Sequence, residues 1–399
     1  MQEKQIIAAG LDAGSRFTRL VVCTLEKGRM RYLGGARVES RGWVKGRIND
    51  QQAVTDCIVE ALREAESAAG VAVGSVTAGI GGTAVRGNNA RGALELGYSR
   101  EVTQSDVNRV LKHASHVQLQ DDRMILHLFP QDFVADGHAG YRDPRKMMAA
   151  KLEVNVHLIT ASVQEHTALV GAINQAHLVV EETVFEGLAA CYAAVQPEER
   201  RQGVAVVDIG AHSTEMVAYW GDAMCLASTA PICGDHFTAD LAQALRVRFV
   251  EAESVKVEFG SASPESCPPN TYVELPTPEN HEPRETTGVF VNQVLEARAE
   301  DLFRFVRSEL VRVGMEQALL GGVFLTGGAA RLEDLCDVAA RVLQCQTRYG
   351  WAVGIEDWPE ALNNPEWCVA AGLAMYSARL RTKAERERET AGWLGKILK

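Results

Sequence analysis

The chain has 399 residues, 46% hydrophobic and 23% charged, a balance typical of a globular protein too long for one ordinary domain. Its net charge of −11 excludes a general nucleic-acid binder, because such proteins need clustered lysines and arginines. Its nine cysteines form no CxxC pair, which argues against a zinc site and for thiols in a reducing compartment.

The first predicted element is a β-hairpin near the start of the chain. An apolar run at 6–11 leads into Asp12-Ala13-Gly14-Ser15, and a second apolar run follows at 18–25. Strand-like runs on either side of a short turn with glycine and a hydroxyl predict two paired strands. The D-x-G-[ST] pattern is short enough to arise by chance, so taken alone it identifies no site.

A mixed α/β stretch follows. Its pattern predicts a helix at 103–114, with Thr103 as the cap and Asp106 at the third helical position. Strands are expected at 125–134 and 152–160, where the sequence alternates between apolar and polar residues.

The hairpin pattern returns in the second half of the chain. An apolar run at 203–207 leads into Asp208-Ile209-Gly210, and the hydroxyls of Ser213 and Thr214 precede another strand-like run at 215–220. Because each half opens on such a hairpin, the sequence predicts two related α/β lobes facing one another, with their turns around a nucleotide.

Two further segments precede the tail. Six of the twelve prolines fall in 260–288, which we expect to be a surface excursion with little regular structure. At 323–326 a buried strand leads into Gly327-Gly328, and a helix is expected at 331–343. Glycine lets the backbone approach a ligand and a helix N-terminus favours an anion, although such joints also occur for packing alone.

The last eight residues form an amphipathic segment after a charged stretch at 379–390. On a helix, four apolar side chains fall on one face and two lysines point away. The residues concerned are Trp393, Leu394, Ile397 and Leu398, with Lys396 and Lys399. This pattern predicts a helix in a membrane interface, with its lysines toward anionic headgroups. The alternative is docking on the protein's own body or on a partner.

The free energy of membrane binding by a single tail is close to zero. Burying four large apolar side chains contributes about 6–12 kcal/mol, whereas ordering the tail costs about 9–18 kcal/mol if it is disordered beforehand. One tail is therefore marginal, whereas many tails presented together would bind by avidity. The start of the chain has no signal-peptide pattern and no apolar run long enough to span a membrane, so we expect a cytoplasmic protein.

Together these segments resemble the FtsA family of actin-like cell-division proteins. The resemblance covers nearly the whole chain, from Gly10 to the C-terminus. Residues 10–15 and 207–214 are similar to the two phosphate loops of the family. Residues 184–189 are similar to the helix that links the lobes, and 325–329 to the adenosine loop.

Other segments resemble FtsA more specifically than they resemble other actin-like proteins. Residues 125–131, Asp143-Pro144 and 82–92 look like the family's insert subdomain, and 233–242 and 252–256 are also close to FtsA. The chain departs from the pattern in both phosphate loops. Ala211-His212 stands where relatives often have consecutive glycines, and Arg16 and Phe17 stand where small hydroxyl residues are common. Alanine is costly at positive φ, which weakens the expectation of efficient hydrolysis.

The resemblance implies an α/β, actin-like fold of the duplicated ribonuclease H type, with two lobes, an FtsA-type insert subdomain and a C-terminal amphipathic helix. The implied boundaries are 1–84 and 164–202 for the first lobe, 85–163 for the insert, 203–230 and 320–380 for the second lobe, 231–319 for its small partner-binding subdomain, 381–391 for a charged linker and 392–399 for the membrane-targeting helix.

The resemblance and the residue chemistry together predict a site for ATP and Mg²⁺. Asp12 and Asp208 would hold waters of a hydrated Mg²⁺, which takes few direct carboxylates. Glu186 would position the attacking water if hydrolysis occurs. The candidate ATP-binding residues are Asp12, Gly14, Ser15, Asp208, Gly210, Ser213, Thr214, Gly234, Lys256, Gly327 and Gly328. Two alternatives stay open, namely Glu186 as a helix-surface carboxylate and Lys256 as a solvated side chain.

The implied function is to polymerise on the cytoplasmic face of the cell membrane at the division septum. The resemblance implies three further partners besides the protein itself: anionic lipid, the C-terminal peptide of the tubulin-like FtsZ at 231–319, and later division proteins at the insert. ATP would be an assembly ligand with slow turnover at most. The alternatives are a small-molecule kinase, which would need a base for its acceptor hydroxyl, and a pilus-assembly actin-like scaffold, against which the tail argues.

Overall fold

The computed structural model describes residues 6–275 and 284–397, with side chains as far as Lys383. The chain divides into two compact units. Unit 1 comprises Met1–Ile80, Glu165–Gln196 and Gly350–Lys399, and unit 2 comprises Gly81–Gln164 and Pro197–Tyr349.

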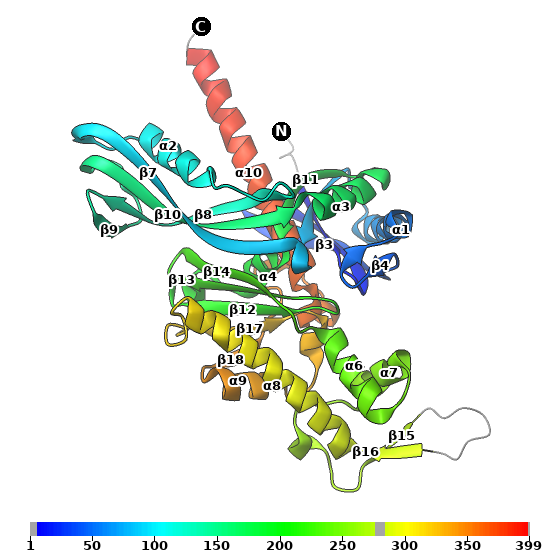
Figure 1. Cartoon of the computed structure of the whole chain (residues 1–399). Coiled ribbons are helices and arrows are strands. Elements are labelled where there is room, and N and C mark those ends of the chain that lie inside the picture. The colour runs from blue at the N-terminus through cyan, green and yellow to red at the C-terminus, as the bar shows by residue number, and fades with distance from the viewer. Residues whose placement is uncertain (1–5, 276–283, 398–399) are drawn as a thin grey trace. The chain divides into compact units, whose positions relative to one another are not determined.

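A six-stranded sheet forms the centre of unit 1 (Figure 1). Its strands, in spatial order, are β11 (Val179–Phe185), β6 (Ser75–Ile80), β1 (Ile6–Ala13), β2 (Phe17–Glu26), β3 (Arg29–Glu39) and β19 (Ile355–Glu356). Strands β1, β2 and β3 form an antiparallel meander, and β6 lies parallel to β1 on its other side. The last six residues of β1 are buried because strands flank it on both sides.

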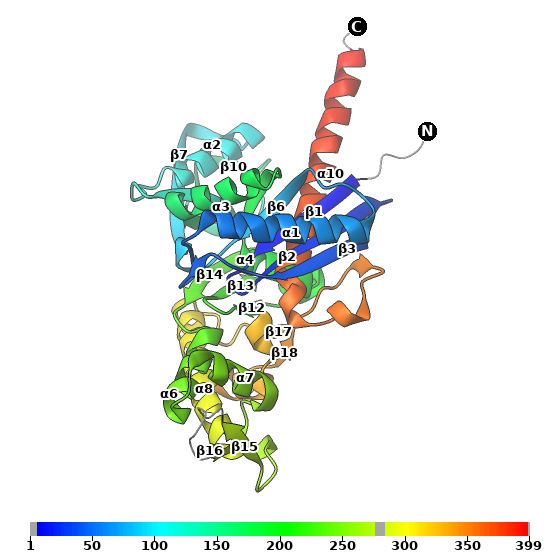
Figure 2. The same cartoon turned by 90° about the vertical axis from the view of Figure 1, so that its right-hand side faces the viewer.

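Helices cover both faces of this sheet. Figure 2 shows α1 (Gln51–Ala69) in front of the sheet and α10 (Cys368–Ile397) behind it. The C-terminal helix packs on β1 and on α4 (Glu186–Ala194). It comes so close to β1 that a Cβ at Gly10 would overlap the backbone of Ala370 and Ala374. The unit also holds most of α3 (Val163–Gln175) and the short hairpin β4 (Trp43–Val44) and β5 (Arg47–Ile48).

A five-stranded sheet in unit 2 repeats the topology of unit 1. Its order is β14 (Ala223–Ala230), β13 (Thr214–Trp220), β12 (Val204–Ile209), β17 (Gly322–Thr326) and β18 (Thr347–Tyr349). Strands β12, β13 and β14 form an antiparallel meander, and β17 lies parallel to β12 as β6 does to β1. The duplicated two-lobed architecture expected from the sequence is therefore confirmed.

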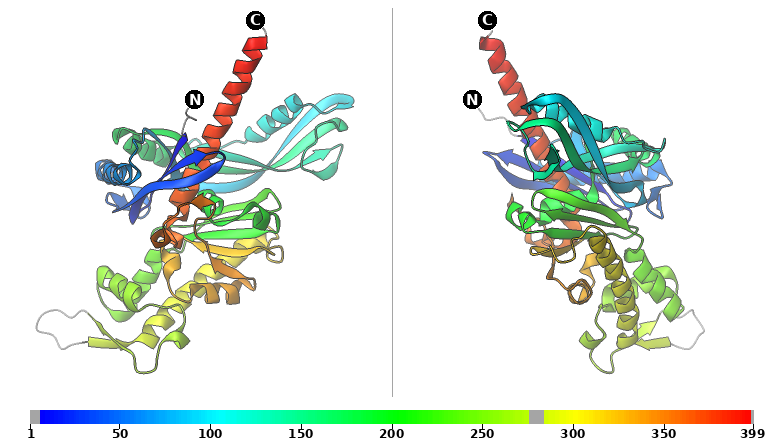
Figure 3. Two further views of the ribbon diagram at one scale, coloured as in Figure 1. Left: turned by 180° about the vertical axis from the view of Figure 1, so that it is seen from behind. Right: turned by 60° about the vertical axis from the view of Figure 1, so that its left-hand side comes forward.

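The insert of unit 2 is a four-stranded antiparallel sheet with one helix against it, seen in cyan to green in Figure 3. Its strands are β7 (Val85–Glu101), β10 (Met148–Ser162), β8 (Arg123–Ala135) and β9 (His138–Tyr141), and its helix is α2 (Gln104–Ser115). The predicted cap is confirmed, since Thr103 and Asp106 bond each other's backbone in a capping box.

The rest of unit 2 surrounds the five-stranded sheet and extends from it. It consists of α5 (Pro197–Arg201), α6 (Gly234–Leu245), α7 (Phe249–Phe259), the hairpin β15 (Tyr272–Leu275) and β16 (Arg284–Thr287), α8 (Gly288–Arg312) and α9 (Leu335–Leu343). The proline-rich excursion thus includes a short hairpin. Helix α9 begins four residues later than predicted because Gly328–Arg331 forms a 3-10 turn first.

Two predicted boundaries differ from the structure. Residues 350–380 were assigned to the second lobe, but they belong to unit 1 because α10 packs on β1 and α4. The charged segment 381–391 was expected as a linker or an exposed helix, and α10 continues through it to Ile397. The predicted membrane-facing side chains from Trp393 to Ile397, together with Leu398 and Lys399, lie outside the described part of the structure.

Candidate functional site

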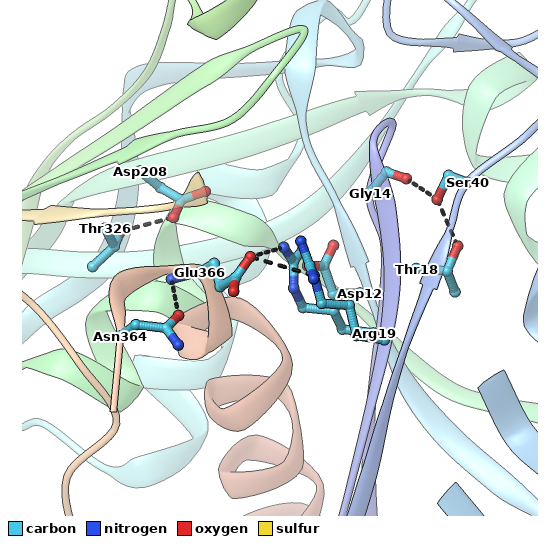
Figure 4. A network of polar contacts seen from close by, with 10 residues as sticks. Asp12, Gly14, Thr18, Arg19, Ser40, Asp208, Thr326, Asn364 and Glu366 are labelled. Atoms are coloured by element: carbon cyan, nitrogen blue, oxygen red, sulfur yellow. Dashed lines mark hydrogen bonds and ion pairs between the residues drawn. The ribbon is translucent and has the colours of Figure 1, made fainter. Parts of the chain in front are cut away.

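The first half of the candidate site is the turn between β1 and β2 in unit 1. Ser40 holds this turn from the end of β3, since its hydroxyl donates to the carbonyl oxygen of Gly14 at 2.7 Å and lies 2.8 Å from Thr18 Oγ1 (Figure 4). Its backbone N–H donates to the carbonyl oxygen of Arg16 at 3.0 Å. Ser15 is half-buried and Arg16 is exposed. The turn is therefore held from one side, and its outer part remains accessible to a ligand.

Asp12 lies at the end of β1, directly opposite Arg19 of β2. Arg19 Nη1 is 3.5 Å from Asp12 Oδ2, and Nη2 donates to Glu366 Oε2 at 2.7 Å (Figure 4). All three side chains are buried. Burial raises the pKa of Asp12 to about 6, although the Arg19 charge opposes this shift. The carboxylate that we expected to face Mg²⁺ thus already has a cationic partner.

Glu186 occupies the first turn of α4, where β11 ends. Its side chain lies against Gly79 of β6, where a Cβ would sit only 3.0 Å from Glu186 Cγ and 3.3 Å from Oε1. The side chain is half-buried, so it lies against the sheet instead of extending from the helix surface. This placement is compatible with the predicted role and does not establish it.

The second half of the candidate site is the turn between β12 and β13 in unit 2. Asp208 is 5% exposed, and its Oδ1 accepts a hydrogen bond of 2.7 Å from the Thr326 hydroxyl on β17 (Figure 4). The N–H of Gly210 donates to the Ser213 carbonyl oxygen at 2.9 Å and closes the turn. Ser213 is half-buried, whereas the Thr214 hydroxyl lies in the interior with no hydrogen-bond partner in the described structure.

The start of α6 fixes the shape of this second turn. Backbone N–H groups of Gly234 and Asp235 donate to the carbonyl oxygens of Gly210 and Ala211, both at 2.9 Å. His212 Nε2 lies 3.0 Å from Asp235 Oδ2, which is a third contact between the turn and α6. Neither Ala211 nor His212 has a positive φ, so the departure from consecutive glycines does not strain this turn.

Two more predicted residues gather around the start of α6. Lys256 of α7 is not a solvated side chain, because its ammonium donates to Thr238 Oγ1 at 2.8 Å and pairs with Glu253 at 2.7 Å. Gly327 has a φ of +90°, and a Cβ there would lie 2.5 Å from the Ile209 carbonyl oxygen. Glycine is thus required where β17 meets β12. Gly328 has open space around its Cα.

The structure brings the second-lobe predictions together in unit 2. In unit 1 it places Asp12, Gly14 and Ser15 at the first turn and Glu186 against Gly79 of β6. Sequence reasoning missed Arg19, Ser40 and Glu366. One signal was visible for Arg19, a charged residue inside the apolar run at 18–25. No pattern marked Ser40 or Glu366, because Ser40 meets the first turn and Glu366 meets Arg19 only through tertiary contacts.

Comparisons with known proteins cover nearly the whole chain. The family model described as the SHS2 domain inserted in FTSA matches residues 82–160, and the model described as Cell division protein FtsA matches 205–372. Cell division protein FtsA of Pseudomonas aeruginosa is 30% identical over 92% of this chain and 88% of its own length. The Escherichia coli K12 protein of the same name is 30% identical over 98% and 96%.

Solved structures with lower identity share the fold. A chain of the PilM-PilN type IV pilus biogenesis complex superimposes with a TM-score of 0.66 at 17% identity, covering 93% of this chain and 98% of its own. MreB5 of Spiroplasma citri bound to ADP gives 0.56 at 13% identity, covering 96% and 99%. These likenesses show an actin-like fold.

Proposed function

The chain belongs to the FtsA family of cell-division proteins, and on this basis we propose that it binds ATP, polymerises on the cytoplasmic face of the cell membrane and tethers the FtsZ ring there. In this proposal ATP is an assembly ligand, and turnover is slow at most. The repeated hairpin is the observation that carries it.

Both units present an aspartate at the end of a buried strand, followed by a turn with glycine and serine. In each unit, a neighbouring element holds the turn by backbone hydrogen bonds, Ser40 in unit 1 and the start of α6 in unit 2. Preformed turns of this kind present N–H groups and hydroxyls to phosphates without further ordering. Ser15 and Ser213 supply the hydroxyls, since Thr214 is buried. Gly327-Gly328 and Lys256 would flank the adenosine.

The two aspartates differ in their fit to Mg²⁺. Asp208 fits, because Thr326 fixes its carboxylate at the end of β12 and a hydrated Mg²⁺ needs few protein ligands. Asp12 does not fit in the observed arrangement, because the Arg19 guanidinium lies against its Oδ2. When bound, Mg²⁺ would offset phosphate charge, and on the protein side we assign it to Asp208.

The helix α10 supports the membrane proposal. Its N-terminal part packs on β1 and α4, and its 30 residues span about 45 Å at 1.5 Å per residue. Because residues 392–397 belong to α10, ordering them costs less than ordering a disordered segment. The apolar residues Trp393, Leu394, Ile397 and Leu398 would enter the interface and Lys396 and Lys399 would meet anionic headgroups. Among the described helices, none is both long and apolar enough to cross a membrane.

The proposed partner surfaces lie in unit 2. The subdomain at 231–319 would bind the FtsZ C-terminal peptide, and α7 within it exposes Val250 and Val257 at 73% and 75%. Exposed apolar side chains are typical of protein-binding surfaces. The insert would contact later division proteins through its sheet and α2.

Electron microscopy of the full chain on an anionic lipid monolayer tests this proposal. We expect filaments with ATP, and few or none without nucleotide or with Asp208→Asn. Filaments that form equally well under all three conditions would contradict ATP as the assembly ligand. An absence of filaments together with an absence of ATP binding would contradict the proposal as a whole.

A further inference from the structure

Glu215 is a buried carboxylate next to the second turn of the candidate site. It lies on β13, two residues after Ser213, and is only 1% exposed. Its Oε1 accepts a hydrogen bond of 2.6 Å from the backbone N–H of Gly82, which begins the 3-10 turn that leads into β7. A carboxylate buried to this extent needs hydrogen-bond donors, and this donor comes from the base of the insert.

Glu215 also belongs to a row of four polar side chains across the five-stranded sheet of unit 2. Opposite it on β12 is Asp208, and Asp208 in turn lies opposite Thr326 of β17. On its other side, Glu215 lies opposite Thr229 of β14. Residues directly opposite each other on paired strands project their side chains to the same face of the sheet. The row therefore leads, on one face, from the aspartate to which we assign Mg²⁺ to β14.

This row holds both polar backbone groups of Gly82, at the base of the insert. While the Gly82 N–H donates to Glu215, its carbonyl oxygen accepts a hydrogen bond of 3.1 Å from the Thr229 hydroxyl. Gly82 also lies beside the second turn, since a Cβ added there would sit 3.7 Å from Ser213 Cβ. The base of the insert therefore contacts a residue proposed to face the phosphates and is bonded to the residue opposite the Mg²⁺ aspartate.

We propose that Glu215 is a positioning residue through which ATP at the second turn orders the base of the insert. Carboxylates directly opposite each other on paired strands repel. Offsetting the charge of Asp208 with a cation relieves this repulsion and strengthens the charge-assisted bond from Gly82 to Glu215. The inference rests on the proposed nucleotide function and deepens it, because it makes the insert, the proposed surface for later division proteins, responsive to ATP.

Hydrogen exchange of the full chain, without lipid and with or without saturating ATP and Mg²⁺, tests the inference at the backbone N–H groups of residues 82–85. We expect ATP to slow exchange there by about fivefold or more, as sites that are energetically coupled do. ATP binding is measured separately by calorimetric titration. Unchanged exchange in a chain that binds ATP would overturn the inference alone, whereas an absence of ATP binding would overturn the nucleotide proposal and the inference with it.

Variants of Glu215 separate this coupling from a purely structural role. Glu215→Ala removes the acceptor, so exchange at 82–85 should no longer be slowed by ATP, whereas Glu215→Gln keeps an acceptor without the charge and should retain only part of the slowing. The matched control is Glu316→Gln, an exposed site of unit 2, which should behave like the natural chain.

A structural role alone would speed exchange in Glu215→Ala by the same factor with and without ATP. The ratio between the two states would then equal that of the natural chain, and this result would overturn the inference. If Glu215→Ala does not fold by circular dichroism, Glu215→Gln decides in its place, and slowing by ATP as large as in the natural chain would overturn the inference.

Discussion

Asp208 and Thr326 lie opposite each other on the parallel strands β12 and β17, and the Thr326 hydroxyl donates to Asp208 Oδ1 at 2.7 Å. This bond fixes the aspartate to which we assign Mg²⁺ in the proposed function. Because a hydrogen bond to a charged group contributes about 1.5–3 kcal/mol, Thr326→Val should weaken ATP binding in Mg²⁺ by about tenfold or more. Calorimetric titration measures the change. Asp337 is exposed on α9, so the control variant Asp337→Asn should bind ATP like the natural chain. Equal affinities of the natural chain, Thr326→Val and Asp337→Asn would contradict the assignment of Mg²⁺ to Asp208.

A second prediction concerns the packing of the C-terminal helix. Gly372 of α10 lies so close to Ala189 of α4 that an added Cβ would overlap the Ala189 backbone. Gly372→Ala should lower the free energy of unfolding by about 1–3 kcal/mol, because neither backbone yields easily. Gly74→Ala is the control, since Gly74 has open space and no positive φ, and its effect should stay within about 0.5 kcal/mol. Chemical denaturation compares the two, and similar effects would argue against the close approach.

A third prediction concerns the insert. Asp106 accepts two bonds from Arg100 at 2.7 and 2.8 Å and one from the Thr103 hydroxyl at 2.7 Å, and these hydrogen bonds hold its pKa well below the usual range. Asp106→Ala removes one half of the capping box of α2 and leaves the Arg100 guanidinium without its carboxylate partner, so it should cost about 2–4 kcal/mol. Hydrogen exchange should then accelerate in α2 and the strands it covers. Exposed Asp121→Ala should leave exchange unchanged, and unaltered exchange in Asp106→Ala would refute the prediction.

A fourth prediction concerns pH. Burial lowers the pKa of His157 on β10 to about 4, and its Nε2 has no hydrogen-bond partner in the described structure. The unfolded chain, with a pKa near 6.5, binds the proton more readily. The stability contributed by the neutral ring is therefore present above pH 6.5 and is lost as the pH falls toward 4. At pH 5 the loss from this group is about 2 kcal/mol.

Replacement of the ring isolates this effect from the other titrating groups. His157→Gln should show a smaller fall in unfolding free energy between pH 7.5 and pH 5, by about 2 kcal/mol, than the natural chain. Exposed His138→Gln should behave like the natural chain. If His157→Gln follows the same pH profile as the natural chain, the buried neutral ring is not the cause.

The sequence was sufficient to predict the features that repeat or alternate. Asp12 and Asp208 were found because the same short motif follows a strand in each half, and α2 was found because its cap and its helical period agree. Such features are specified by residues close together in the sequence, so they can be predicted without knowing which distant segments come into contact.

Other features depend on contacts between distant segments. Arg19 and Glu366 are 347 residues apart, and nothing near either residue specifies the pair. Lys256 is a similar case. Its neighbours in the sequence suggest a surface lysine, and its contact with Thr238 of α6 exists only because α7 packs beside α6. Thr214 was predicted to face the ligand with Ser213, yet neighbouring strand residues point to opposite faces, and Thr214 is buried.

Co-sedimentation of the full chain with vesicles tests the central claim most directly, that an ATP-dependent assembly attaches to the membrane by its tail. Vesicles of phosphatidylglycerol and phosphatidylcholine are compared with vesicles of phosphatidylcholine alone, each with and without ATP. The natural chain and a control with Thr390→Glu and Ala391→Glu should pellet with the anionic vesicles, and more so with ATP. Trp393→Glu with Leu394→Glu should remain in the supernatant. The account would be contradicted if both double variants pelleted equally, or if the amount of protein that pellets did not depend on ATP.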